Sequence, residues 1–75
     1  MKDLVEYIAR NLVDNPDAVQ VRESRGDYMV RVQLTVDPEE KGKVIGREGK
    51  IARAMRTIVN AAAARDGRRG VLEIE

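Results

Sequence analysis

The chain has 75 residues, and its 14 basic and 13 acidic side chains leave a formal net charge of +1. A chain of this length forms one small domain with a limited core, so a homodimer or another partner complex would not be surprising. The absence of both cysteine and histidine excludes disulfides, thiol catalysis and histidine acid–base chemistry, and it removes the usual zinc ligands.

The N-terminal residues 1–6 lack the apolar run of a signal peptide. No other segment approaches the ~20 consecutive apolar residues that a membrane span requires. We therefore expect a soluble cytoplasmic protein with no membrane contact. Because cysteine and histidine are missing, we expect neither an enzyme nor a protein that holds a metal or a cofactor.

A first helix is predicted to begin at Asp3, which has capping-box spacing to Glu6, and to end before Pro16. Its apolar side carries Leu4, Val5, Ile8 and Leu12. Two strands are predicted to follow, at residues 18–23 and 28–36, with a turn at 24–27.

The second of these strands has the clearest pattern, because apolar and polar residues alternate along it. The apolar positions are Tyr28, Val30, Val32, Leu34 and Val36. Such alternation is typical of a sheet with one buried face and one solvent-exposed face. We expect both tyrosines of the chain, Tyr7 and Tyr28, to occupy core positions, which leaves no aromatic surface for stacking nucleic-acid bases.

A second helix is predicted to start at Asp37, which suits the cap position, with Pro38 in the first helical position and Glu40 at the capping-box position. It ends at Ile45, and a third helix occupies residues 50–65. A last strand is predicted at 71–75. Two parallel strands need a crossover of a dozen or more residues, and the helical pair supplies it. We therefore expect one α+β domain over residues 1–75, with a three-stranded mixed sheet, three helices on one face and the order αββααβ.

The third helix has an apolar arc that is wider than packing on a sheet requires. Ile51, Met55, Ile58 and Ala62 form one stripe, with Ala52, Val59 and Ala63 beside it, while Arg53, Arg56 and Asn60 lie on the solvent side. Core packing is the simplest explanation for each apolar residue. Part of the arc could instead face a ligand groove or a second subunit, and the residues expected at a dimer interface are Met55, Ile58, Val59 and Ala62.

The link between the second and third helices, Gly46-Arg47-Glu48-Gly49, has the pattern Gly-x-x-Gly. Two glycines three positions apart allow a tight turn whose backbone can approach another backbone closely. The helix that begins at Lys50 presents unpaired N–H groups, which favour phosphate. A plain corner between two helices would also use glycines, so the loop by itself leaves both readings open.

Positive charge is concentrated around this loop. Residues 1–40 carry five basic and nine acidic side chains, whereas residues 41–69 carry nine basic and two acidic ones. A solvated charged face is the usual meaning of such a run. Its coincidence with a loop suited to anions favours a polyanion as the partner.

A nucleotide-binding enzyme is the first alternative, because the segment from Gly42 to Lys50 is glycine-rich and basic. Its spacing does not match a P-loop, because Arg47 stands five residues after Gly42 where a glycine is needed and Ile51 follows Lys50. A dinucleotide-binding fingerprint would need a glycine where Val44 stands. A second alternative is a protein-interaction module that acts mainly through the third helix.

The element order, with Val44-Ile45-Gly46-Arg47-Glu48-Gly49 between two helices, resembles the KH domain in its type II arrangement. The similarity covers all 75 residues and is greatest to the KhpA (YlqC) family of small stand-alone KH domains. The resemblance implies binding of single-stranded RNA, with about four nucleotides held against the loop and their bases over an apolar groove. It also implies homodimers, a heteromeric complex with the KH-containing protein KhpB (Jag), and a role as a post-transcriptional regulator or RNA chaperone in cell-envelope elongation, division and cell shape.

The resemblance assigns RNA-binding roles to particular residues of this chain. These are the loop glycines Gly46 and Gly49, the variable pair Arg47 and Glu48, the helix residues Lys50 and Arg53, and a groove floor formed by Val44, Ile45, Ala52 and Val36. Two positions depart from the family pattern. Many KH domains have a branched apolar residue where this chain has Ala52, and Glu48 repels phosphate, so Arg47 and Lys50 must offset it.

Overall fold

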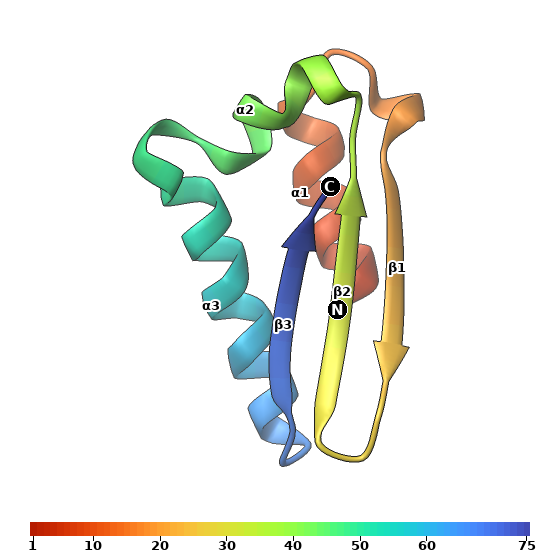
Figure 1. Ribbon diagram of the computed structural model, residues 1–75, viewed down its shortest axis with the longest axis vertical. Coiled ribbons are helices and arrows are strands. Elements are labelled where there is room, and N and C mark those ends of the chain that lie inside the picture. Colours follow the sequence, from red (N-terminus) through yellow and green to blue (C-terminus); the bar gives the residue numbers. More distant parts are fainter.

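The sheet has three strands in the order β1–β2–β3, and the helices lie on one of its faces (Figure 1). The computed structural model describes residues 1–75. The elements are α1 (Lys2–Leu12), β1 (Gln20–Arg25), β2 (Met29–Thr35), α2 (Lys41–Ile45), α3 (Lys50–Arg65) and β3 (Arg69–Ile74), with 3-10 turns η1 (Pro16–Ala18), η2 (Pro38–Glu40) and η3 (Arg47–Gly49). β2 pairs antiparallel with β1 and parallel with β3. The predicted α+β fold with a mixed sheet and the order αββααβ is therefore confirmed, and it is the type II KH arrangement.

The alternating pattern of β2 places its apolar residues against the helices. Val30, Val32 and Leu34 are fully buried, as the pattern predicts. The core positions predicted for the tyrosines are wrong, because Tyr28 is 85% exposed and Tyr7 is 68% exposed. Tyr28 lies in the turn before β2, where the strand alternation no longer applies, and Tyr7 is on the outer side of α1.

Several predicted boundaries differ from the structure by one or two residues. α1 begins at Lys2 and no side chain caps it, so the Asp3–Glu6 capping box does not form. β1 begins at Gln20 because the preceding residues make the turn η1. β3 begins at Arg69, where it pairs with Met29. None of these helices is long and apolar enough to cross a membrane.

Glu40 is a buried carboxylate that ties the end of α1 to the start of α2. Asp37 caps η2 as predicted, accepting the N–H of Glu39 at 3.0 Å. Glu40 does not complete a capping box there. Its carboxylate instead accepts the backbone N–H groups of Asp14 at 2.5 Å and Asn15 at 3.0 Å. Lys43 donates to the carboxylates of Asp14 and Glu40, and these two contacts, Asp14 first, raise the pKa of Lys43.

α3 turns a narrower face to the sheet than its wide apolar arc predicts. The buried residues are Ala52, Met55, Val59 and Ala63, while Ile51 and Ala62 are half-buried and Ile58 is 37% exposed. Met55 and Val59 therefore belong to the core of the monomer, and their side chains are not available to a partner. This corrects the predicted dimer interface, of which Ile58 and Ala62 remain accessible.

Candidate nucleic-acid interface

The loop between α2 and α3 depends on left-handed backbone conformations. Gly46 has a φ of 77° and Gly49 a φ of 74°, a region that favours glycine. A Cβ atom on Gly46 would also lie 2.7 Å from Cγ1 of Ile51, whereas one on Gly49 would meet nothing within 4 Å. Gly46 is therefore required by the fold itself, and Gly49 keeps the outer side of the loop open.

Glu48 has a φ of 58° and is the only non-glycine residue of the chain with a positive φ. This conformation costs a residue with a Cβ atom about 1–2 kcal/mol. The backbone carbonyl of Glu48 accepts a hydrogen bond from Nη2 of Arg53 at 2.7 Å. The arginine therefore holds the turn in its strained conformation, and its remaining N–H groups are still able to bind other acceptors.

The loop leads directly into a helix of 16 residues whose N-terminus no side chain caps. The N–H groups of the first turn therefore have no side-chain acceptor. The positive end of the helix dipole lies at the same place, and both features favour an anion.

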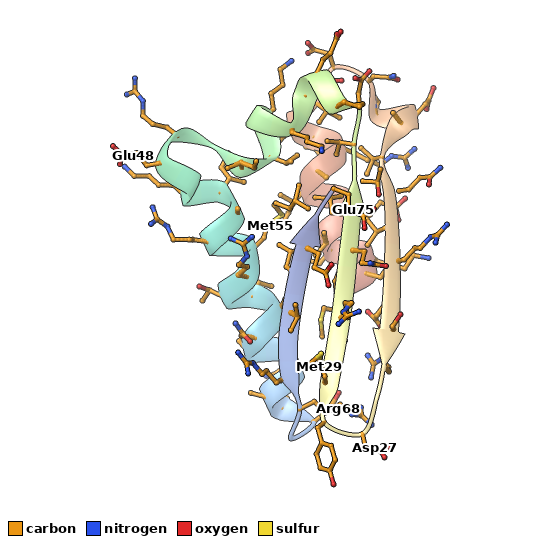
Figure 2. The ribbon with its side chains drawn as sticks, viewed as in Figure 1. Asp27, Met29, Glu48, Met55, Arg68 and Glu75 are labelled. Carbon is orange, nitrogen blue, oxygen red and sulfur yellow. The ribbon has the colours of Figure 1, made fainter.

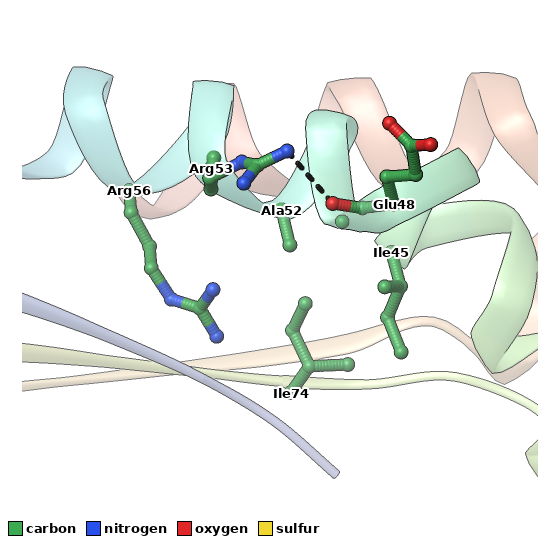
Figure 3. Close-up of a pocket in the computed structure, with 7 residues that line it drawn as sticks. Ile45, Glu48, Ala52, Arg53, Arg56 and Ile74 are labelled. Atoms are coloured by element: carbon green, nitrogen blue, oxygen red, sulfur yellow. Dashed lines mark hydrogen bonds between the residues drawn. The ribbon is translucent and has the colours of Figure 1, made fainter.

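A cleft of about 380 Å³ opens between this loop, the first half of α3 and the end of β3. Its lining residues are Ile45, Glu48, Gly49, Ala52, Arg53, Arg56 and Ile74. The side chains of Ile45, Ala52 and Ile74 point toward one another and form an apolar floor, while Arg56 extends over one end (Figure 3). The cleft thus combines a small apolar floor with charged groups at its rim.

The cations around this cleft are not used in ion pairs. Arg47, Lys50, Arg53 and Arg56 are exposed, and none of them contacts a carboxylate. The ion pairs of the chain lie elsewhere, on α1, on the sheet and around Lys43. Positive charge beside the cleft is therefore available to a ligand, and Glu48 is the one acidic residue that lines it.

The structure places the predicted RNA-binding residues in three groups. Ile45, Glu48, Gly49, Ala52 and Arg53 line the cleft; Gly46, Arg47 and Lys50 lie in the loop and at the start of α3; and Val44 and Val36 are buried in the core. The two buried valines therefore do not form the surface of the cleft.

Sequence reasoning missed two residues of the cleft. Arg56 was assigned to the solvent side of the third helix, but its long side chain reaches the rim. Ile74 is near the C-terminal end of the chain, but it lies at the cleft because β3 pairs parallel with β2 and Ile74 is therefore opposite Leu34. The apolar character of Ile74 was visible in the sequence, but its position at the cleft depends on the parallel pairing.

Comparison with known proteins gives a consistent result over the whole chain. The family described as KhpA/KhpB, KH domain, matches residues 2–74. The chain is 54% identical over 74 residues to the RNA-binding protein KhpA of Aquifex aeolicus, covering 99% of this chain and 94% of the relative. It is 51% identical over 74 residues to the RNA-binding protein KhpA of Clostridium acetobutylicum, covering 99% of both chains. No solved structure matches the chain. The chain belongs to the KhpA/KhpB KH domain family.

Proposed function

We propose that this protein binds single-stranded RNA at the cleft beside the Gly46–Gly49 loop. The observation that carries the proposal is that an uncapped helix N-terminus, an open glycine loop and unpaired cations surround one apolar cleft. The relatives from Aquifex aeolicus and Clostridium acetobutylicum are named RNA-binding proteins, which supports the same function here.

The loop side of the cleft and its apolar floor bind different parts of the RNA. The sugar–phosphate backbone lies against the loop, where Gly49 allows close approach and Arg47 and Lys50 supply charge. The bases lie over Ile45, Ala52 and Ile74. Because no aromatic side chain lines the cleft, base stacking on it is weak, and we expect modest affinity and limited sequence preference.

Single strands suit this cleft better than duplexes do. Bases reach an apolar floor only when they are unpaired and turned away from a partner strand. β3 is an edge strand of the sheet, and its end at Ile74 borders the cleft. We propose that backbone groups of this edge hydrogen-bond with the Watson–Crick edges of the bases, which a paired base does not present.

The proposal is tested with a double substitution in the loop, Arg47→Asp with Glu48→Asp. We expect binding to short single-stranded RNA, measured by fluorescence anisotropy, to weaken at least ten-fold, roughly 1.4 kcal/mol or more, because an anion replaces the loop's only cation. The fold should survive, since aspartate accepts the left-handed conformation of residue 48 more readily than most residues.

The matched control is Arg22→Asp, which changes the net charge by the same two units on the solvent face of β1. It should bind RNA nearly as well as the native chain. If the folded loop variant bound RNA as tightly as the native chain, the loop would not be the binding site. A protein-interaction module would then explain the protein better than RNA binding at this loop.

A second role, self-association or docking of a partner, is favoured by one observation. Apolar side chains on the helical layer remain exposed, with Leu4 of α1 44% and Ile58 of α3 37% exposed. We propose that this surface supports a homodimer or a heteromeric complex with a KhpB-type protein, in keeping with the KhpA/KhpB family match. The corresponding cellular role would be that of a cytoplasmic RNA chaperone or post-transcriptional regulator linked to cell-envelope elongation and division.

A further inference from the structure

The end of the molecule opposite the loop carries four arginines and an exposed tyrosine. Figure 2 shows Asp27, Met29 and Arg68 at this end and Glu48 at the other. Two chain segments meet here, the turn between β1 and β2 and the turn between α3 and β3. The backbone N–H of Arg69 donates to the carbonyl of Tyr28 at 2.8 Å, so the two turns are held together. We call this region the distal end, and its basic residues are Arg25, Arg65, Arg68 and Arg69.

Tyr28 is the most exposed large apolar residue of the chain, at 85%. Its ring packs against no core and therefore does not stabilise the fold through burial. A tyrosine at the tip of a hairpin offers both faces of its ring to a ligand, and unpaired bases stack on such rings with little sequence preference. The cleft lacks an aromatic residue, so Tyr28 supplies a type of contact that the cleft does not offer.

The arginines of the distal end are largely free to bind anions. Arg65, Arg68 and Arg69 form no ion pair, whereas Arg25 contacts Glu23 at 2.8 Å and Asp66 at 3.6 Å. Nε of Arg68 is buried and has no hydrogen-bond partner. Arg25 is shared between Glu23 and Asp66, and Asp27 lies in the same turn as Tyr28. The arginines of the distal end that have no carboxylate partner are therefore Arg65, Arg68 and Arg69.

We propose that the distal end is a second contact site for single-stranded RNA, where the unpaired arginines bind phosphates and Tyr28 stacks on a base. This inference rests on the proposed RNA binding at the cleft, and it deepens that function by extending the length of RNA that one molecule covers. Arginines interleaved with an exposed aromatic ring match an unpaired nucleotide, which carries both a phosphate and an open base face.

α3 connects the cleft to the distal end. Its first half borders the cleft, and its last residue is Arg65. A helix of 16 residues is about 24 Å long at ~1.5 Å per residue. A strand stacked at ~3.4 Å per nucleotide covers that length with about seven nucleotides. An RNA of about five nucleotides therefore fills the cleft only, and one of about fifteen reaches both sites.

The experiment compares these two RNA lengths on a variant with Arg65→Gln and Arg69→Gln. Both side chains are exposed, so the fold should be retained, and a thermal melt checks this. For the longer RNA we expect binding to weaken about three- to ten-fold, and the slope of log K against log salt to become shallower by about 1.4, at ~0.7 per phosphate. Binding of the shorter RNA should not change. The matched control, Arg10→Gln with Arg22→Gln, removes the same charge elsewhere and should leave both lengths bound as before.

A second pair of variants tests the stacking contact. Tyr28→Phe keeps a ring and should bind the longer RNA like the native chain, whereas Tyr28→Ser should bind it about ten-fold more weakly. Unchanged binding and salt slope for the arginine variant, with the short RNA still bound, would overturn the second site and leave the cleft proposal standing. Failure of the native chain to bind either length would instead overturn the proposed function, and the second site with it.

Discussion

The carbonyl oxygen of Val59 lies 2.5 Å from the point where a Cβ atom on Gly70 would stand. The backbone of α3 is therefore in direct contact with β3 at this position, closer than a side chain on residue 70 would allow. The same helix and strand diverge toward Ile74, where the cleft opens between them. The Val59–Gly70 contact thus fixes α3 on the sheet at the point from which the cleft widens.

Gly70→Ala should be destabilising, because the new methyl group would push α3 away from β3. Overpacking of this kind costs about 1–3 kcal/mol, which lowers the thermal midpoint of a domain this small by roughly 4–8 °C for each kcal/mol. The control is Gly42→Ala in α2, where a Cβ atom would meet nothing within 4 Å, and which should be neutral or stabilising by up to about 1 kcal/mol. If the Gly70→Ala variant had the same thermal midpoint as the native chain, α3 and β3 would separate easily at this contact.

Replacement of Glu40 by alanine should destabilise the chain by about 2–4 kcal/mol, measured by urea unfolding. Glu40 is 8% exposed, and its carboxylate accepts the backbone N–H groups of Asp14 and Asn15 just after α1. Loss of the carboxylate leaves both donors without a partner. Asp14→Ala removes only the exposed ion pair with Lys43 and should cost less than about 1 kcal/mol. Equal effects of the two substitutions would mean that the ion pair, and not the backbone contacts, carries the stabilisation.

Substitutions at Glu48 should separate backbone strain from charge. Glu48→Gly relieves the left-handed strain at φ 58° and should stabilise the chain by about 0.5–1 kcal/mol. Glu48→Gln keeps the strain and should not change stability. Both remove the acidic group that lines the cleft, so both should tighten RNA binding. If neither variant changed the affinity for RNA, the phosphates of the bound RNA would not lie near Glu48.

RNA binding should weaken as salt rises, since cations at the cleft release counterions from the strand. For about three phosphate contacts, log K falls with log salt at a slope near 2, or about twenty-fold between roughly 50 and 200 mM salt. Arg56→Gln should make the slope shallower by about 0.7 if Arg56 binds one phosphate. A flat salt response of the native chain would argue against backbone clamping.

Ile58→Glu should weaken self-association, and so lower the average molecular mass measured in solution, without unfolding the protein. Ile58 is 37% exposed on the helical layer, so a charge there disturbs a partner contact more than the core. Analytical ultracentrifugation at micromolar concentrations measures the effect, and Asn60→Glu on the opposite flank of α3 is the control. A native chain that is strictly monomeric over this range would contradict the predicted self-association.

The strongest local patterns of the sequence were the most informative about the fold. The alternation from Val30 to Leu34 identified β2 and its buried face, because side chains of a strand point to opposite sides at every second residue. The length of the third helix followed from its run of helix-forming residues between Gly49 and Asp66. The two loop glycines marked the turn, since few other residues adopt its left-handed backbone.

The face of each element that meets the core was less predictable. An apolar arc as wide as that of α3 allows several orientations, and contact with β3 through Gly70 selects the one that buries Met55 and Val59. Tyr7 and Tyr28 were expected inside because both fitted core positions, Tyr28 as the first apolar residue of the alternating strand, but the core is filled by valines and by Leu34 and Met55.

The order of the elements, the Gly-x-x-Gly turn and the concentration of cations beside it could all be predicted from the residues in chain order, because these features depend on neighbouring residues. Which side chains share the cleft could not be predicted in this way, because it depends on long-range contacts in the folded chain. Ile74 reaches Ile45 and Ala52 only through the parallel pairing of β3 with β2, and Arg69 reaches Tyr28 only because two distant turns meet. Contacts of this kind depend on how the chain folds back on itself, which no local pattern of residues records.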